Sequence, residues 1–280
     1  MNIYDAITNA NRILKKNNIK SAQLDSEILM SKVLNKNRKY IILNLNKEIQ
    51  KDNLVKFNEL VLERSLGKPV AYLTGKKEFW KHEFNVSDKT LVPRPDSEIL
   101  VDQILKITKN KSKIKILEIG VGTGCILLSI LKERNNFSGF GIDISKKCIE
   151  ISKINATELK LLNRVKFFET NVDNFFYGKY DLIVSNPPYI EESKLKYLEK
   201  EINNYEPMLA LKGGNDGLSL IRRVVKRSSK LLKKSGKLYL EIGYDQKFRV
   251  KSILEKENFY VNKTVKDYGR NNRCIVCTKI

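Results

Sequence analysis

Apolar residues near the start of the chain recur at the spacing of an α-helix. The first set returns to one face about every 3.6 residues and comprises Ile3, Ala6, Ile7, Ala10, Ile13 and Leu14. The same spacing continues in residues 22–34 and in residues 54–66. Helix-breaking residues then end the pattern, at Gly67, Pro69 and Gly75. The pattern predicts a small helical domain over residues 1–75.

The next stretch, residues 76–95, contains EFWKHEFNVSDKTLVPRP, which is typical of a β-hairpin. We place its turn at the polar residues Asn85–Lys89 and expect the hairpin to link the helical domain to the rest of the chain. His82, the only histidine, lies in this linker. We expect a surface or packing role for it rather than a catalytic one.

From residue 96 onward, helical patterns alternate with short apolar runs. The runs that predict strands are KIKILEIG, GFGIDI, RVKFFET, YDLIVS, GKLYLEIG, FYVNKTVKD and RCIVCTKI. A helix with an N-terminal cap is expected at DSEILVDQILKI, residues 96–107. Strands that are apolar throughout, with helices between them, predict an α/β domain whose parallel sheet is covered on both faces. We assign residues 96–280 to this domain.

Composition limits the class of protein. The chain is 41% hydrophobic and 30% charged, as folded water-soluble proteins are. No apolar run is long enough for a transmembrane helix, and the first residues lack the apolar core of a signal peptide. We therefore expect a cytoplasmic protein with no membrane contact.

The charge balance is strongly basic. Lys and Arg number 53 against 32 Asp and Glu, a net charge of +21. Such a charge suggests a polyanionic partner such as RNA, DNA or a ribosome. Lysine is abundant at plain surface positions as well, and no dense basic block occurs. The charge thus fits either a partner or a general compositional bias, and we do not expect direct nucleic-acid binding to be required.

The four cysteines do not predict a metal site. Cys274 and Cys277 form CIVC, which has the spacing of half a zinc site. In a strand, however, residues three apart point to opposite faces of the sheet. No second pair exists, so we expect reduced thiols and no metal.

A glycine loop follows the first strand of the α/β domain, in EIGVGTGCI. Its glycines, Gly120, Gly122 and Gly124, allow the backbone to turn sharply from strand to helix and to approach a ligand closely. A dinucleotide fingerprint would carry a third glycine where Cys125 stands. The loop therefore predicts a nucleoside ligand other than NAD, with a purely structural turn as the alternative.

Asp143 ends the second strand, in GIDI. A carboxylate at this position can accept hydrogen bonds from both ribose hydroxyls of a nucleoside. The alternative is a cap for the helix that follows. The order of the glycine loop and Asp143, without the lysine of a phosphate-binding loop, favours S-adenosyl-L-methionine as the cofactor.

The strand at residues 180–185 ends in the stretch NPPY, Asn186–Tyr189. Two adjacent prolines hold the backbone rigid. The Asn186 side-chain oxygen and the Pro187 carbonyl can accept hydrogen bonds from a planar NH2 group, and the Tyr189 ring can pack on the plane. This arrangement would position a delocalised amide or aromatic amine for attack on a sulfonium methyl. The alternative is a plain strand end followed by a core tyrosine. It explains less well why Asn186 comes directly before the prolines and Tyr189 directly after them, so we favour the functional role.

EIGVGTGCI, GIDIS and DLIVSNPPYI together resemble class-I methyltransferases that modify planar amino groups. The resemblance implies a class-I S-adenosylmethionine-dependent methyltransferase fold, a Rossmann-like seven-stranded sheet with an antiparallel last strand, beside the small N-terminal helical domain. NPPY alone leaves open adenine-N6 enzymes on DNA, guanine-N2 enzymes on rRNA, and protein-glutamine enzymes.

The segments that flank NPPY narrow the resemblance. PVAYLTGKKEFWKHEFNVSDKTLVPRPDSEILVD, EINNYEPMLALKGGNDGLSLIRRV and the final VKDYGRNNRCIV resemble the peptide chain release factor glutamine N5-methyltransferase family. A sister family that acts on a large-subunit ribosomal protein shares NPPY, but its corresponding segment reads more like VPRSP than PRPDSE. The resemblance covers essentially the whole chain.

This resemblance implies a set of site residues. The cofactor would contact Gly120, Val121, Gly122, Thr123, Gly124, Asp143, Asn171, Val172 and Asn186. The glutamine of the Gly-Gly-Gln loop would lie against Asn186, Pro187, Pro188 and Tyr189, with Asn186, Pro187 and Tyr189 catalytic. Members of the family often have an aromatic residue beside adenine where this chain has Asn171 or Val172.

We expect Arg94, in PRP, either to line the entrance for the cofactor or to form a structural ion pair. We expect residues 206–207 and 213–217 to form a loop near the substrate, and the alternative is that Gly213 and Gly214 only shape the entry to the next helix. The helical domain would recognise the release factor, and we expect a monomer. A ribosomal protein substrate, a nucleic-acid amine, and a ribosome-associated binding module with a regulatory nucleoside site are the alternatives.

Overall fold

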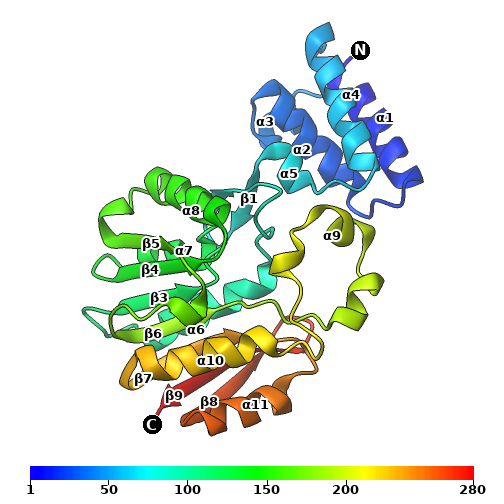
Figure 1. Ribbon diagram of the computed structural model, residues 1–280. Coiled ribbons are helices and arrows are strands. Elements are labelled where there is room, and N and C mark those ends of the chain that lie inside the picture. Colours follow the sequence, from blue (N-terminus) through cyan, green and yellow to red (C-terminus); the bar gives the residue numbers. More distant parts are fainter. The chain divides into compact units, whose positions relative to one another are not determined.

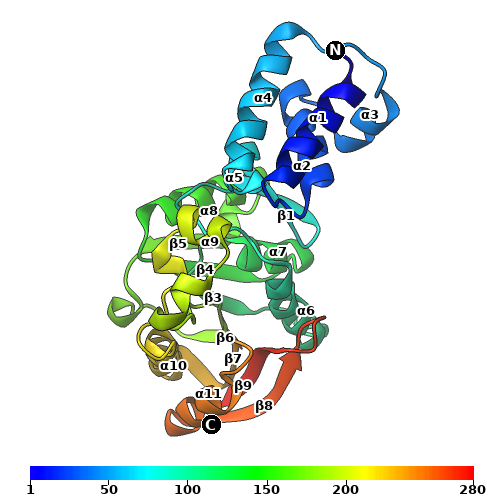
Figure 2. The same ribbon diagram turned by 90° about the vertical axis from the view of Figure 1, so that its right-hand side faces the viewer.

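A computed structural model describes all 280 residues of the chain. It divides into two compact units, which are described separately (Figures 1 and 2). The helical unit comprises Met1–Lys76 together with Glu199–Tyr205. The sheet unit comprises Lys77–Leu198 and Glu206–Ile280.

The helical unit contains six helices. They are α1 (Ile3–Lys16), α2 (Ala22–Leu34), α3 (Arg38–Leu43), α4 (Lys51–Ser65), α5 (Val70–Thr74) and α9 (Lys200–Tyr205). Asn2 caps α1, because its side chain accepts a hydrogen bond from the Asp5 N–H at 2.8 Å. The apolar stripe of α1 packs into the core of this unit, except that Ile13 is exposed. The three short helices, α3, α5 and α9, were not predicted.

A buried arginine joins three segments of the helical unit. Arg64 on α4 is 4% exposed. Its Nε lies 2.7 Å from Asp25 Oδ2 on α2, and its Nη1 lies 2.8 Å from Glu201 Oε2 on α9. The Tyr205 hydroxyl also donates to the Leu66 carbonyl at 3.3 Å. Residues 199–205 are thus held in the helical unit although they lie far along the chain.

The linker forms a hairpin of β1 (Lys76–Phe79) and β2 (His82–Asn85), but its predicted turn at Asn85–Lys89 is wrong. The turn lies at Trp80 and Lys81, with Trp80 at a positive φ of 57°. Hydrogen bonds from distant elements hold this conformation. The Trp80 N–H donates to Glu98 at 2.7 Å, and its indole N–H donates to Glu133 at 3.1 Å. The prediction of the turn considered only neighbouring residues, so it could not include these two distant partners.

The sheet unit is built on seven strands. They are β3 (Lys115–Ile119), β4 (Ser138–Asp143), β5 (Val165–Glu169), β6 (Tyr180–Ser185), β7 (Leu232–Glu241), β8 (Phe259–Lys266) and β9 (Asn272–Lys279). The strand order is β5-β4-β3-β6-β7-β9-β8. Strand β9 runs antiparallel to both β7 and β8, and the other neighbouring pairs are parallel. The predicted α/β sheet with a reversed last strand is confirmed.

Helices cover both faces of this sheet (Figure 1). The helices α6 (Glu98–Ile107), α7 (Cys125–Glu133) and α8 (Lys146–Glu158) pack with one set of inward side chains. The helices α10 (Ser219–Leu231) and α11 (Lys247–Lys256) pack with the other set. Cys274 and Cys277 belong to opposite cores, as the period of a strand requires.

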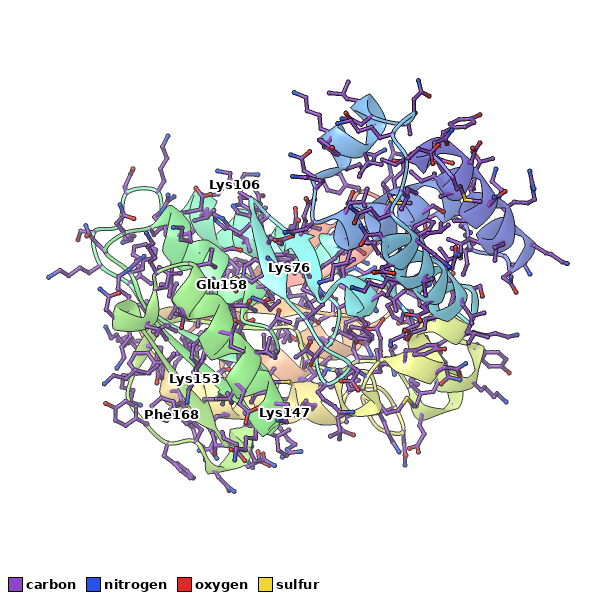
Figure 3. The ribbon with its side chains drawn as sticks, turned by 90° about the horizontal axis from the view of Figure 1, so that it is seen from above. Lys76, Lys106, Lys147, Lys153, Glu158 and Phe168 are labelled. Atoms are coloured by element: carbon purple, nitrogen blue, oxygen red, sulfur yellow. The ribbon has the colours of Figure 1, made fainter.

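Helix α8 illustrates how the sequence pattern becomes a layer. Its Cys148, Ile149 and Ala156 are buried against the sheet. Its Lys147, Lys153 and Glu158 are exposed, and Figure 3 labels them along this helix. The helix therefore buries one face and leaves the charged face in water.

The chain reverses its direction of strand addition between β3 and β6. Strands β4 and β5 add on one side of β3, and β6 and β7 add on the other. Ile119 and Ser185 are register partners at the carboxyl ends of these adjacent strands. The glycine loop and NPPY therefore start side by side, at the point where open α/β sheets bind ligands.

Candidate active site

A cavity of about 550 Å³ opens at this edge of the sheet unit. Nine of the predicted site residues line it: Gly120, Val121, Gly122, Thr123, Asp143, Asn171, Val172, Asn186 and Pro188. Gly124, Pro187 and Tyr189 do not line it. The fold thus brings most of the predicted residues together, from the ends of β3, β4, β5 and β6.

The glycine loop leaves its cavity side open. Gly120, Gly122 and Gly124 have φ values of 75°, 55° and 78°, where a side chain would be strained. A Cβ added at Gly120 or Gly122 would meet no other atom within 4 Å. At Gly124 it would lie 3.0 Å from the Leu128 side chain. The first two glycines therefore face free space, and the third allows helix α7 to pack closely.

Asp143 holds the glycine loop from the neighbouring strand. Its Oδ2 accepts from the Gly122 N–H and its Oδ1 from the Ser145 N–H, both at 2.9 Å. The cap of α8 is Ser145, whose side chain accepts from the Cys148 N–H, so the capping alternative for Asp143 is wrong. Burial raises the pKa of Asp143, and the two backbone N–H groups oppose that rise.

Glu118 lines the cavity as well, although the sequence analysis gave it no role. It is 2% exposed, and its Oε2 accepts from the Leu127 N–H at 3.0 Å. Burial raises the pKa of this carboxyl well above its ordinary value. Its place on strand β3, two positions before Gly120, was the signal that could have identified it.

Asn171 and Val172 follow β5 and line the cavity. Arg223 on α10 donates to Asn171 Oδ1 at 2.6 Å and to Asp173 Oδ2 at 2.7 Å. Arg223 lines the cavity too and was not predicted. No aromatic side chain lines the cavity.

Asn186 is oriented by a residue from another part of the chain. Its Nδ2 donates to Ser97 Oγ at 3.0 Å, and Ser97 Oγ donates to Glu241 Oε2 at 2.6 Å. Ser97 occupies the N-cap position of α6 but makes no capping hydrogen bond there, so the cap expected for residues 96–107 is wrong. Because the NH2 of Asn186 is engaged, Oδ1 is the acceptor that this amide can offer to a ligand.

The Tyr189 hydroxyl lies between the carboxyl group of Glu241 and the guanidinium group of Arg273. It donates to Glu241 Oε1 at 3.4 Å and accepts from Arg273 Nη1 at 3.3 Å. Arg273 also pairs with Asp267 at 3.0 Å. Burial raises the pKa of Glu241 to about 7 and raises that of the Tyr189 phenol. Ser97, Glu241 and Arg273 were not predicted.

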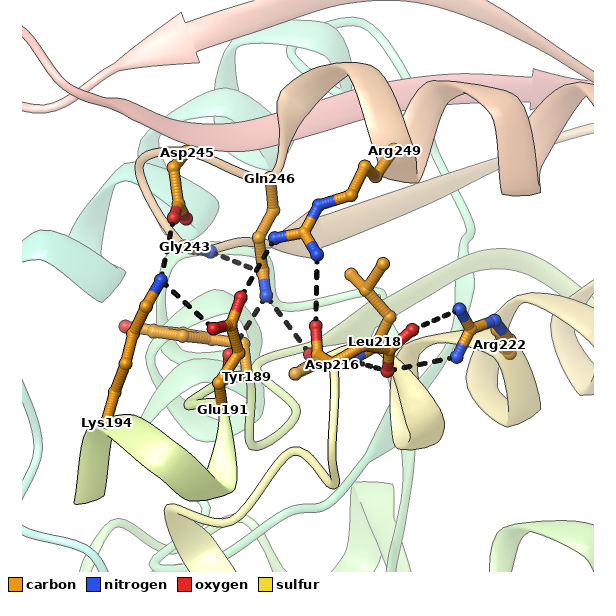
Figure 4. A network of polar contacts seen from close by, with 11 residues as sticks. Tyr189, Glu191, Lys194, Asp216, Leu218, Arg222, Gly243, Asp245, Gln246 and Arg249 are labelled. Atoms are coloured by element: carbon orange, nitrogen blue, oxygen red, sulfur yellow. Dashed lines mark hydrogen bonds and ion pairs between the residues drawn. The ribbon is translucent and has the colours of Figure 1, made fainter. Parts of the chain in front are cut away.

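The main chain of NPPY is held at its last residue, Tyr189, by Gln246 (Figure 4). Gln246 is 2% exposed, and its Nε2 donates to the carbonyls of Tyr189 at 2.9 Å and Gly217 at 3.1 Å. A Cβ on Gly213 would lie 2.8 Å from the Tyr189 carbonyl carbon, and one on Gly217 would lie 2.6 Å from its oxygen. These two glycines let the 213–217 loop pack directly on the NPPY backbone.

Two other sequence expectations have definite positions. Arg94 both lines the cavity and forms an ion pair with the buried Glu206, so the two alternatives for it coexist. His82 lies on β2, does not line the cavity, and has a pKa lowered mainly by burial.

The sheet order and the cavity at its reversal point are those of the class-I methyltransferase fold. The match to known structures agrees: a methyltransferase from Pyrococcus furiosus superposes with a TM-score of 0.54 at 19% identity, over 79% of this chain and 97% of that one. Residues 95–214 match the methyltransferase small domain, and residues 5–75 match the PrmC N-terminal domain.

Full-length relatives define the family. The chain is 40% identical to the release factor glutamine methyltransferase of Buchnera aphidicola (subsp. Schizaphis graminum), over 93% of this chain and 94% of the relative. It is 37% identical to that of Clostridium acetobutylicum, over 100% and 99%. The chain therefore belongs to the release factor glutamine methyltransferase family, and the predicted family and enzyme class are confirmed. None of its helices combines the length and apolar character that crossing a bilayer requires.

Proposed function

We propose that this protein transfers the methyl group of S-adenosyl-L-methionine to the side-chain amide nitrogen, N5, of the glutamine in the Gly-Gly-Gln motif of peptide chain release factors. The observation that carries the proposal is the position of Asn186. Its Oδ1 is available as an acceptor at a strand end next to the glycine loop, in a chain of this family.

The residues around the cavity fit this cofactor. Gly120 and Gly122 leave open space beside a cavity of about 550 Å³, which suits a ligand of nucleoside size. Val121, Thr123 and Gly124 would complete the loop around its methionine part, and Asp143 would accept from its ribose hydroxyls. Asn171 and Val172 would lie beside the adenine.

The NPPY residues would handle the substrate amide. When bound, S-adenosylmethionine supplies an electrophilic methyl, whose carbon–sulfur bond breaks as the carbon–nitrogen bond forms. Asn186 Oδ1 and the Pro187 carbonyl would accept the two N–H groups and direct the nitrogen lone pair toward the methyl. Tyr189 and Pro188 would pack against the amide plane. The N–H becomes acidic only as the methyl arrives, and its proton then leaves to water, so no ionised base is needed to start the reaction.

The helical unit would recognise the release factor as a protein partner. This role distinguishes the proposal from the nucleic-acid alternative, which rests on the shared NPPY motif and on the net charge of +21. A ribosomal protein as substrate is supported less well, since the relatives named above are release factor enzymes. A cytoplasmic monomer is part of the same proposal.

Mass spectrometry of an intact release factor tests the proposal. The purified factor is incubated with S-adenosylmethionine and enzyme, digested, and searched for a gain of one methyl group on the Gly-Gly-Gln peptide. We expect the gain with the natural enzyme and its loss with Asn186→Ala. An unmodified glutamine with the natural enzyme would reject the proposal. So would transfer of the methyl group only to RNA or DNA added to the reaction.

A further inference from the structure

We infer that Glu241 is a positioning residue for the proposed methyl transfer: its two carboxylate oxygens fix both ends of the Asn186–Tyr189 segment, so that Asn186 Oδ1 points toward the substrate amide. The inference rests on the proposed function. It assigns a role to a buried acid at the end of β7 that does not line the cavity.

The first contact is made through Ser97. A serine hydroxyl has one proton to donate, and Glu241 Oε2 receives it at 2.6 Å. The Ser97 oxygen can then only accept from Asn186, and the donor at 3.0 Å is Asn186 Nδ2. With the NH2 held in this way, the amide of Asn186 cannot turn its oxygen toward Ser97. The carboxylate charge thus selects which end of the Asn186 amide faces outward.

The second contact is made with Tyr189. Glu241 Oε1 accepts from the Tyr189 hydroxyl at 3.4 Å, and Arg273 Nη1 donates to the same hydroxyl at 3.3 Å. The register that pairs Ser185 on β6 with Leu240 on β7 places Glu241 alongside the first residue of NPPY. One rigid strand end therefore supports both the acceptor and the ring that would contact the substrate amide.

The surroundings keep Glu241 close to the border between its two charge states. It is 2% exposed. Arg273 favours the carboxylate, and Asp96 opposes it. The neutral Tyr189 phenol and the thiols of Cys125 and Cys274 also face it, and burial raises the pKa of both thiols out of the neutral range. Protonation would turn one Glu241 oxygen into a donor, so Ser97 and Tyr189 could no longer both donate to it.

The test compares two variants with matched controls in release factor methylation. Ser97→Ala removes the link to Asn186. Glu241→Gln leaves a single acceptor oxygen for two donors. Ser129→Ala changes a fully buried serine that has no hydrogen-bond partner. Glu133→Gln changes an acid that accepts from the Trp80 indole, away from the cavity.

We expect kcat to fall about 10- to 100-fold in Ser97→Ala and Glu241→Gln, because small misplacements of a reacting group slow a positioned reaction by such factors. The Kd for S-adenosylmethionine should stay within about threefold, and the controls should match the natural enzyme. The kcat of the natural enzyme should decline as the pH falls through about 7, and Glu241→Gln should lack this decline.

The outcomes separate the inference from the proposed function. A natural enzyme that leaves the glutamine unmethylated rejects the proposed function. A natural enzyme that methylates it, while Ser97→Ala and Glu241→Gln keep the kcat of the controls, rejects the inference alone. Retention of the decline near pH 7 in Glu241→Gln also rejects it. If either variant fails to fold, the other variant and the pH profile of the natural enzyme still decide.

Discussion

Two neighbouring strand ends in the sheet unit, those of β3 and β6, are built in different ways. After β3, the chain forms a loop of glycines at positive φ, and the ligand side of that loop is open space. After β6, the chain is stiffened by two prolines. Ser97 and Glu241 hold its side chains, and Gln246 holds the main-chain carbonyl of Tyr189. In the proposed function, the first end would contact the cofactor through its main chain, and the second would position side chains against the substrate. Changes at the first should therefore alter cofactor affinity, and changes at the second should alter turnover.

The largest effect should come from Asn186→Ala. This variant removes the acceptor that would bind the substrate N–H. We expect kcat to fall about 100- to 1000-fold, the loss that follows removal of one hydrogen-bonding group from a reaction centre. Binding of S-adenosylmethionine, measured by calorimetry, should stay within a few-fold. Asn135→Ala, at an exposed asparagine, is the control. A large loss of cofactor affinity in Asn186→Ala would remove the distinction between the two ends.

The next effect should come from Gly120→Ala, which tests the other end. An added methyl group would project into the cavity and compete with the cofactor. We expect Kd for S-adenosylmethionine to rise roughly 100-fold, equivalent to the upper range for overpacking. Gly75→Ala is a close match, because Gly75 has a φ of 76° against 75° for Gly120 and also has no atom within 4 Å of an added Cβ. Only Gly120 lines the cavity.

The two glycine variants share the strain of a left-handed alanine, about 1 kcal/mol. Both should therefore lose similar stability in chemical denaturation. A rise in Kd with Gly75→Ala as large as that with Gly120→Ala would mean that strain, rather than the methyl group in the cavity, weakens binding.

A smaller loss of affinity is expected for Asp143→Asn. Both oxygens of Asp143 accept from backbone N–H groups, and an amide can accept at only one of them. Either the Gly122 N–H or the Ser145 N–H should lose its hydrogen bond, and the ribose should lose one acceptor. We expect Kd to rise about tenfold, with kcat at saturating cofactor little changed. Asp245→Asn removes an exposed acid of the sheet unit outside the cavity and should leave both constants unchanged. A drop in kcat with unchanged Kd would contradict the assignment.

The cofactor end could be predicted because its information is local. In the sequence, the glycines come directly after one apolar strand and Asp143 ends the next one. The alternation of apolar strands and helices was enough to predict the sheet. Predictions from neighbouring residues were wrong where the conformation depends on hydrogen bonds to residues far away in the sequence. The hairpin turn lies at Trp80, held by Glu98 and Glu133, rather than at the polar residues after it. Ser97 resembles a helix cap but donates to Glu241 instead.

The substrate end could be predicted only in part for the same reason. NPPY is visible as four adjacent letters. Its supports are not, because Ser97 lies 89 positions from Asn186 and 144 from Glu241. Nothing in the run LYLEIG marks its glutamate as a partner of a serine at the start of a distant helix. The register of β6 with β7 brings them together.

The smallest expected effect concerns stability at the substrate end. Burial raises the pKa of Glu241 from 4.5 to about 7. Between these two values the folded protein holds a proton that the unfolded chain has released, so the free energy of unfolding falls as the pH rises through this window. Glu241→Gln cannot ionise and lacks this contribution. Relative to the natural protein, the variant should therefore gain on the order of 1 kcal/mol between pH 5 and pH 8, measured by urea unfolding at both values. Glu133→Gln changes an acid whose pKa is lowered by Lys81 and Trp80, and it should show no such gain.

A constant difference between Glu241→Gln and the natural protein would mean that Glu241 is already ionised at pH 5. Turnover would then not depend on its protonation near pH 7.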